Sequence, residues 1–140
     1  MRALDPAGRL AIVTCMVAAP AFAQQTPTDL AELKKYAGTY AVDCSKPDAL
    51  RLTVDPATLT ASAAAKQLKT GAPLSAFSYF GKAQPPKGFE VALLGAAQPA
   101  GLTLLVMRDA TGPYLTVDAD RTLESQFGQT ALAGKFRRCP

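Results

Sequence analysis

The chain has 140 residues, of which 15 are Lys or Arg and 11 are Asp or Glu, so its formal net charge at pH 7 is +4. It contains no His, the side chain that most often acts as a general base near neutral pH and most often binds transition metals, so the sequence excludes His-dependent catalysis and His metal sites. No run of Lys or Arg is longer than two, and the aromatic residues are not interleaved with basic ones, so we expect no nucleic-acid partner.

The first 23 residues have the pattern of an export signal. Arg2 and Arg9 flank a short n-region, residues 10–19 form an apolar core, and small residues at Ala21 and Ala23 fit a signal-peptidase site. The apolar run is too short to cross a bilayer, which takes about 20 residues, so we expect no permanent membrane span.

Cleavage after position 23 would remove residues 1–23 as the signal peptide and leave residues 24–140 as a single β-rich domain. Cys15 lies within the signal and is interpreted as one of its apolar residues. An acylated lipoprotein cysteine is the alternative, although residues 12–14 fit that pattern poorly. We expect a monomeric bacterial protein that is periplasmic or secreted.

Two cysteines, Cys44 and Cys139, remain after the signal is removed. Exported compartments are oxidising, so the simplest expectation is one disulfide between them. The bridge would close a loop of about 95 residues, for which the chain-entropy model assigns about 4 to 5 kcal/mol. Catalytic dithiols are normally close in sequence and sit at the start of a helix. We therefore expect a structural bridge and not a redox site.

The first element of the mature chain is predicted to be a short amphipathic helix over residues 28–37. Leu30, Leu33 and Ala37 recur at three and four residues, and Gly38 follows as a stop. Its apolar stripe is expected to lie on the body of the domain.

Alternation of apolar and polar residues then predicts a series of strands. They cover residues 39–44, 50–54, 58–63, 89–93, 102–107 and 114–117. Residues 102–107 are apolar on both faces, which predicts a central strand covered on both sides. The alanine-rich segment 64–69 is compatible with either strand or helix and is left open.

Near the C-terminus, Asp120 is expected to cap a helix over residues 121–127, and residues 135–139 should end the chain as a short strand or extended tail. The predicted fold class is α+β and mainly β. It is a small antiparallel sheet or open barrel of about six to eight strands, with a short N-terminal helix and a short helix near the C-terminus.

Two regions are candidate surfaces for recognition of another protein. One is the aromatic patch that precedes a Pro-rich loop, residues 81–88, together with that loop. The other is the basic end of the chain. The candidate binding residues are Phe77, Tyr79, Phe80, Lys82, Lys87, Arg137 and Arg138. The structural alternatives are core packing of the aromatic residues and a solvated strand edge for the basic ones.

No cluster of residues in the sequence favours catalysis. The chain has no G-x-S-x-G motif, and a Ser or Cys nucleophile would have no His to activate it. Asp118 and Asp120 project on one side of an extended segment near Glu124, as in an acid/base pair or a Ca²⁺ site. Thr122 and Leu123, however, stand where a calcium loop needs Asp or Asn and then Gly. We interpret these carboxylates as a helix cap and a solvated turn, and predict no catalytic residue, no metal and no cofactor.

A small exported antiparallel sheet with one long-range disulfide resembles, in size and class, the small periplasmic inhibitors and binding proteins of bacteria, such as the lysozyme-inhibitor barrels. The resemblance matches no motif residue by residue, and fold does not fix function. The leading hypothesis is a non-enzymatic binding protein of the bacterial envelope, inhibitor-like or accessory, that binds another envelope protein. The alternatives are a barrel-type carrier of a small apolar ligand and a hydrolase that uses Asp118 or Asp120.

Overall fold

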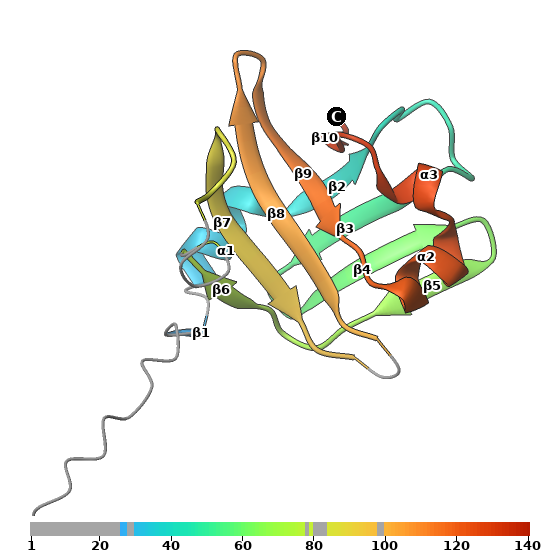
Figure 1. Ribbon diagram of the computed structural model, residues 1–140, viewed down its shortest axis with the longest axis horizontal. Helices are drawn as coiled ribbons and strands as arrows, with labels where there is room; N and C mark the ends of the chain where they lie inside the picture. Colours follow the sequence, from blue (N-terminus) through green and yellow to red (C-terminus); the bar gives the residue numbers. More distant parts are fainter. Residues whose placement is uncertain (1–25, 28–29, 78, 80–83, 98–99) are drawn as a thin grey trace, which may run out of the picture.

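The structure is a computed structural model that describes residues 26–27, 30–77, 79, 84–97 and 100–140 (Figure 1). The expected signal peptide and the candidate binding residues Phe80 and Lys82 lie outside the described residues. The described part is mainly β, with two five-stranded antiparallel sheets and three short helices. The predicted fold class is therefore confirmed.

Sheet A is built from the middle of the chain and one N-terminal strand. Its order is β1 (Thr26–Pro27), β6 (Leu74–Ala76), β7 (Phe89–Gly95), β8 (Leu102–Asp109) and β9 (Gly112–Asp118). The β8–β9 hairpin runs in register from Thr103 opposite Asp118 to Asp109 opposite Gly112. This is the pairing expected from two alternating segments separated by a tight turn.

Sheet B combines the first part of the domain with the end of the chain. Its order is β10 (Arg137–Arg138), β2 (Gly38–Ala41), β3 (Arg51–Asp55), β4 (Thr58–Ala63) and β5 (Lys66–Lys69). Figure 1 shows sheet A lying across sheet B, with helices α2 (Arg121–Phe127) and α3 (Gln129–Leu132) beside sheet B and α1 (Leu30–Tyr36) at the other end of the domain.

The segment that the sequence left open is a strand. Ala63 pairs with Lys66 across a two-residue turn, in which Ala64 has φ +48°. Positive φ is uncommon outside glycine but is what a two-residue hairpin turn demands. Beyond the turn, Leu68 points inward and is buried, whereas Lys66 and Lys69 are exposed.

The first predicted strand is shorter than its alternation indicated. β2 ends at Ala41 instead of continuing to Cys44. Tyr40 and Ala41 are both buried, whereas Val42 is 60% exposed. The strand stops because the Asp43 carboxylate accepts hydrogen bonds from the backbone N–H and the hydroxyl of Ser45, which turns the chain away from the sheet.

The main core lies between the two sheets, where Leu52 of sheet B and Leu104 of sheet A are fully buried. Helix α1 contributes Leu33 to this core, as expected of its apolar stripe, and also Tyr36, which the stripe did not include. The outer face of sheet A carries a second buried cluster, formed by Ala92, Leu105, Met107 and Tyr114. Strand β8 is thus covered on both faces, as its sequence predicted.

Backbone pairing between Leu115 and Phe136 and between β10 and β2 joins the two sheets along one side. The two residues of β10 directly follow Phe136. On the other side, β5 and β6 are not hydrogen-bonded to each other in the described part of the chain, so the barrel is open. No helix among the described residues is long and apolar enough to cross a membrane.

Candidate functional site

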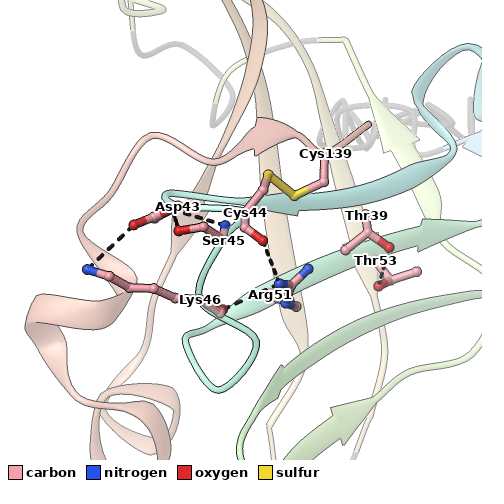
Figure 2. Close-up of a disulfide and its surroundings, with 8 residues drawn as sticks. All are labelled: Thr39, Asp43, Cys44, Ser45, Lys46, Arg51, Thr53 and Cys139. Atoms are coloured by element: carbon pink, nitrogen blue, oxygen red, sulfur yellow. Dashed lines mark hydrogen bonds and ion pairs between the residues drawn. A yellow bond between two sulfur atoms is a disulfide. The ribbon is translucent and has the colours of Figure 1, made fainter.

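The disulfide links the β2–β3 loop to the end of the chain (Figure 2). The Sγ atoms of Cys44 and Cys139 lie 1.98 Å apart, and their Cα atoms 5.7 Å apart, across a sequence separation of 95. The predicted pairing is therefore confirmed. The backbone N–H of Cys139 also donates to the Thr39 carbonyl at 2.8 Å, so the end of the chain is held to β2 by a hydrogen bond and to the β2–β3 loop by the disulfide.

The loop that carries Cys44 is internally bonded. Arg51 donates from Nη2 to the carbonyl oxygens of Cys44, at 2.9 Å, and Lys46, at 3.4 Å. Asp43 pairs with Lys46 at 3.5 Å, and its hydrogen bonds from Ser45 lower the pKa of its carboxyl. Figure 2 shows Asp43, Ser45 and Lys46 on the loop beside the bridge, with Arg51 at the start of β3. These bonds hold the loop in one conformation next to the disulfide.

The basic end of the chain is engaged with the β8–β9 turn. Arg137 Nη2 lies 2.6 Å from Asp109 Oδ2, and Lys135 Nζ lies 3.2 Å from the same oxygen. Both cations also lie over the Tyr114 ring, at 4.9 and 4.7 Å from its centroid. Hydrogen bonds from Arg137, and then from Thr111, hold the pKa of Asp109 well below its usual range.

The two candidate arginines therefore have different environments. Arg137 also donates to the Gly112 carbonyl at 3.0 Å, and its guanidinium is occupied within the domain. Arg138 is exposed and makes no ion pair with any described residue; its guanidinium lies against Gly38. Of these two arginines, Arg138 alone presents an unoccupied charge.

A row of side chains across the outer face of sheet A connects the aromatic patch to the basic end of the chain, although the two are far apart in sequence. The ring of Tyr79 contacts that of Phe89 edge-on, with centroids 5.3 Å apart. Phe89 is the register partner of Met107, which is in turn the partner of Tyr114. We call Tyr79, Phe89, Met107 and Tyr114 the outer row. It ends under the cations of Lys135 and Arg137.

Exposed side chains border this face. Phe77 is 59% exposed just beyond β6, and Leu74 is 37% exposed at the start of that strand. Lys87 is also exposed, whereas Tyr79 is half-buried by its contact with Phe89. Of the predicted aromatic residues that the structure describes, Phe77 is the one presented to solvent.

A pocket that the sequence did not predict lies beside the disulfide loop, with a volume of about 420 Å³. Its lining comes from the β2–β3 loop, β4, helices α2 and α3, and the residue before β10. The lining residues are Val42, Asp43, Lys46, Asp48, Ala49, Leu50, Ala63, Phe127, Thr130, Ala131 and Phe136. These segments are far apart in the chain, so no local pattern predicts that they form a pocket. The one hint in the sequence is Val42, an apolar residue beside a turn.

Asp120, one of the two carboxylates considered for catalysis, has a structural role. Asp120 is the N-cap of α2 and accepts a hydrogen bond from the Leu123 N–H at 2.9 Å, as predicted. Within the described part of the chain, no group of three or more His, Cys, Asp or Glu side chains is placed to hold a metal ion. Glu90 pairs with Arg108, which lowers the pKa of the Glu90 carboxyl, and also accepts a hydrogen bond from the Tyr36 hydroxyl.

Comparison of the chain with known protein families, with characterised proteins and with solved structures found no match. The arrangement of its own residues therefore carries the functional argument.

Proposed function

We propose that this chain is an exported, disulfide-stabilised binding protein of the bacterial envelope that recognises another protein through the outer face of sheet A. The observation that carries the proposal is the exposure of Leu74, which pairs with Leu94 of that face, and of Phe77, the residue after β6. Aromatic and aliphatic side chains exposed beside an apolar cluster are typical of protein-binding surfaces, whose energy is concentrated in a few such anchors.

The composition of the outer face supports this proposal. An antiparallel sheet with one face in water normally carries polar residues on that face. Sheet A instead carries Ala92, Leu105, Met107 and Tyr114 there, with Leu94 packed against them. The centre of the cluster is already buried within the domain, so the part left for a partner is its border at Leu74 and Phe77.

The filled interior favours this function over the alternative of a ligand carrier. A barrel-type carrier holds its ligand between the sheets. Here that space is occupied by the main core, in which Leu52, Leu59, Leu102, Leu104 and Phe136 have no exposed surface.

Site-specific photocrosslinking tests the proposal. Phe77 is replaced by benzoylphenylalanine, which keeps a phenyl group at that position, and the exported protein is irradiated in the envelope of the producing cell. Lys69, which is exposed on β5 of sheet B, is the matched control position. We expect one discrete protein adduct from position 77 and none from position 69. Identical adducts at both positions, or none at position 77, would contradict the proposal.

Substitutions then measure the contribution of each candidate group to binding of the captured protein. Phe77→Ala is expected to weaken binding about tenfold or more, as for an interface anchor. Arg138→Ala tests the unoccupied guanidinium without touching Asp109. Arg137→Ala would instead break an ion pair inside the domain, so it must be compared with the wild type for stability before its effect on binding is interpreted.

A further inference from the structure

The pocket beside the disulfide loop has the size and lining of a small-molecule site. Its volume of about 420 Å³ lies within the range typical of ligand pockets, roughly 300 to 1,000 Å³. Leu50, Ala63, Phe127 and Phe136 give it an apolar interior. Such pockets bind through apolar contact and are made selective by a small number of polar groups.

An exposed apolar side chain stands in the wall of this pocket. Three large hydrophobic residues are exposed in the described part of the chain: Val42, Leu74 and Phe77. Leu74 lies in β6 of sheet A and Phe77 follows that strand, whereas Val42 lines the pocket. An occupant of the pocket would cover Val42.

The charged groups at the rim define the head group that fits. Asp43, Lys46 and Asp48 line the pocket, and Asp43 and Lys46 neutralise each other as an ion pair at 3.5 Å. Asp48 is exposed and makes no hydrogen bond or ion pair with any described residue. Among the charged side chains that line the pocket, Asp48 is therefore the one without an ion-pair partner in the described part of the chain, and its negative charge is complementary to a cation.

The walls are held in place before any ligand binds. The disulfide fixes the β2–β3 loop to the end of the chain. On the opposite wall, Lys66 donates to the Gln126 carbonyl at 2.7 Å and ties the end of α2 to β5. A site with preformed walls loses little conformational entropy when it is filled.

We propose that this pocket binds a small amphipathic cation, with its apolar body against Val42, Leu50 and Phe127 and its positive head beside Asp48. This site is separate from the outer face of sheet A, so the test of ligand binding is independent of the test for a protein partner.

The test uses three probes with the same alkyl chain, each below its micelle-forming concentration: octyltrimethylammonium, octyl sulfate and octanol. Binding is followed by NMR of the methyl groups of the mature, oxidised protein. We expect saturable shifts at Val42, Leu50, Ala63 and Ala131, and a Kd for the ammonium at least about tenfold lower than for the sulfate. Equal affinity for the two ions, tighter binding of the sulfate, or shifts centred elsewhere would overturn the proposal.

Matched variants separate the pocket from its charge. Ala131 lines the pocket and Ala133 does not, and both are exposed near α3. Ala131→Phe should abolish binding of all three probes, whereas Ala133→Phe should leave it unchanged. Asp48→Asn should remove the preference for the ammonium over the sulfate and leave octanol binding intact, and Asp118→Asn should change neither. Loss of binding in both alanine variants, or an unchanged ion preference in Asp48→Asn, would overturn the assignment.

Discussion

Leu115 and Phe136 exchange two backbone hydrogen bonds, each of 2.9 Å, and this pair joins sheet A to the segment that continues into sheet B. The Phe136 side chain is fully buried in the main core, and its neighbours Lys135 and Arg137 cover Tyr114 on the outer face. The end of the chain is thus a structural element that contacts both sheets and carries the disulfide one residue after β10.

Replacement of Phe136 by Ala should destabilise the domain strongly. Truncation of a buried Phe typically costs about 3 to 5 kcal/mol, because transfer energy is lost and a cavity is left. Phe77→Ala is the matched control, since its side chain is 59% exposed and exposed substitutions usually change stability by about 0.5 kcal/mol or less. Urea unfolding of both variants measures the difference. Equal loss in the two would show that Phe136 is not a core residue.

The bridge between Cys44 and Cys139 should be complete in the mature protein and should contribute much of its stability. We expect no free thiol in the denatured, unreduced protein by thiol titration, and two after reduction. The double substitution Cys44→Ser, Cys139→Ser should lower the free energy of unfolding by up to about 4 to 5 kcal/mol, the chain-entropy value for a loop of this length. Two titratable thiols before reduction would refute the bridge.

Local patterns in the sequence predicted the parts of the fold that depend on local chemistry. The alternation of Leu102, Leu104 and Val106 predicted β8, because these three side chains share the inward face of the sheet. Asp120 predicted the start of α2, because its carboxylate accepts a hydrogen bond from a backbone N–H that has no acceptor within the helix. Cys44 and Cys139 predicted the bridge, because no other cysteine remains after the expected cleavage.

Features that depend on contacts between distant segments were not predicted from the sequence. The exposure of Val42 follows from the Asp43 turn, which competes with the alternation that would have continued the strand. The outer row depends on the register of β7 with β8 and of β8 with β9, which places Phe89 level with Tyr114. The pocket forms where the β2–β3 loop, β4, helices α2 and α3 and the residue before β10 come together, and local periodicity carries no information about contacts between such segments.

Gly88 should resist substitution for a steric reason. Its φ of +90° lies in the region that favours glycine, and an added Cβ would strike the backbone carbonyl of Arg108 on the neighbouring strand. Gly88→Ala should therefore destabilise the domain by roughly 1 to 3 kcal/mol, the usual range for backbone strain. Gly71, where an added Cβ meets nothing within 4 Å, is the control. The prediction fails if thermal unfolding shows the same change in Gly88→Ala and Gly71→Ala.

The cap of α2 should be measurable separately from any catalytic role. Asp120→Ala removes the hydrogen bond to the Leu123 N–H and should cost about 1 kcal/mol, within the usual range for loss of an N-cap. Asp118→Asn, which changes an exposed carboxylate outside the helix, should cost little. Urea unfolding provides both values. A catalytic carboxylate would behave differently, since its replacement would remove a hydrolytic activity without this loss of stability.

The ion pairs of Asp109 should make stability depend on pH at the acid end. Because Arg137 and Thr111 lower the pKa of Asp109 in the folded protein, the unfolded chain binds the proton first as pH falls. The stabilisation is therefore complete above the ordinary aspartate pKa of about 3.9 and is lost as pH falls through it toward the folded value. Asp43 and Glu90, whose pKa values are also lowered, act in the same direction.

Asp109→Asn isolates this carboxylate from the other two. The variant should be less stable than the wild type at pH 7, and the difference should shrink as the pH is lowered from 5 to 3, because Asp109 of the unfolded wild-type chain then takes up a proton and the unfolded state is favoured. Urea midpoints at pH 7, 5, 4 and 3 measure the trend. A difference that stays constant over this range would contradict the prediction, because it would mean that the negative charge of Asp109 does not contribute to stability.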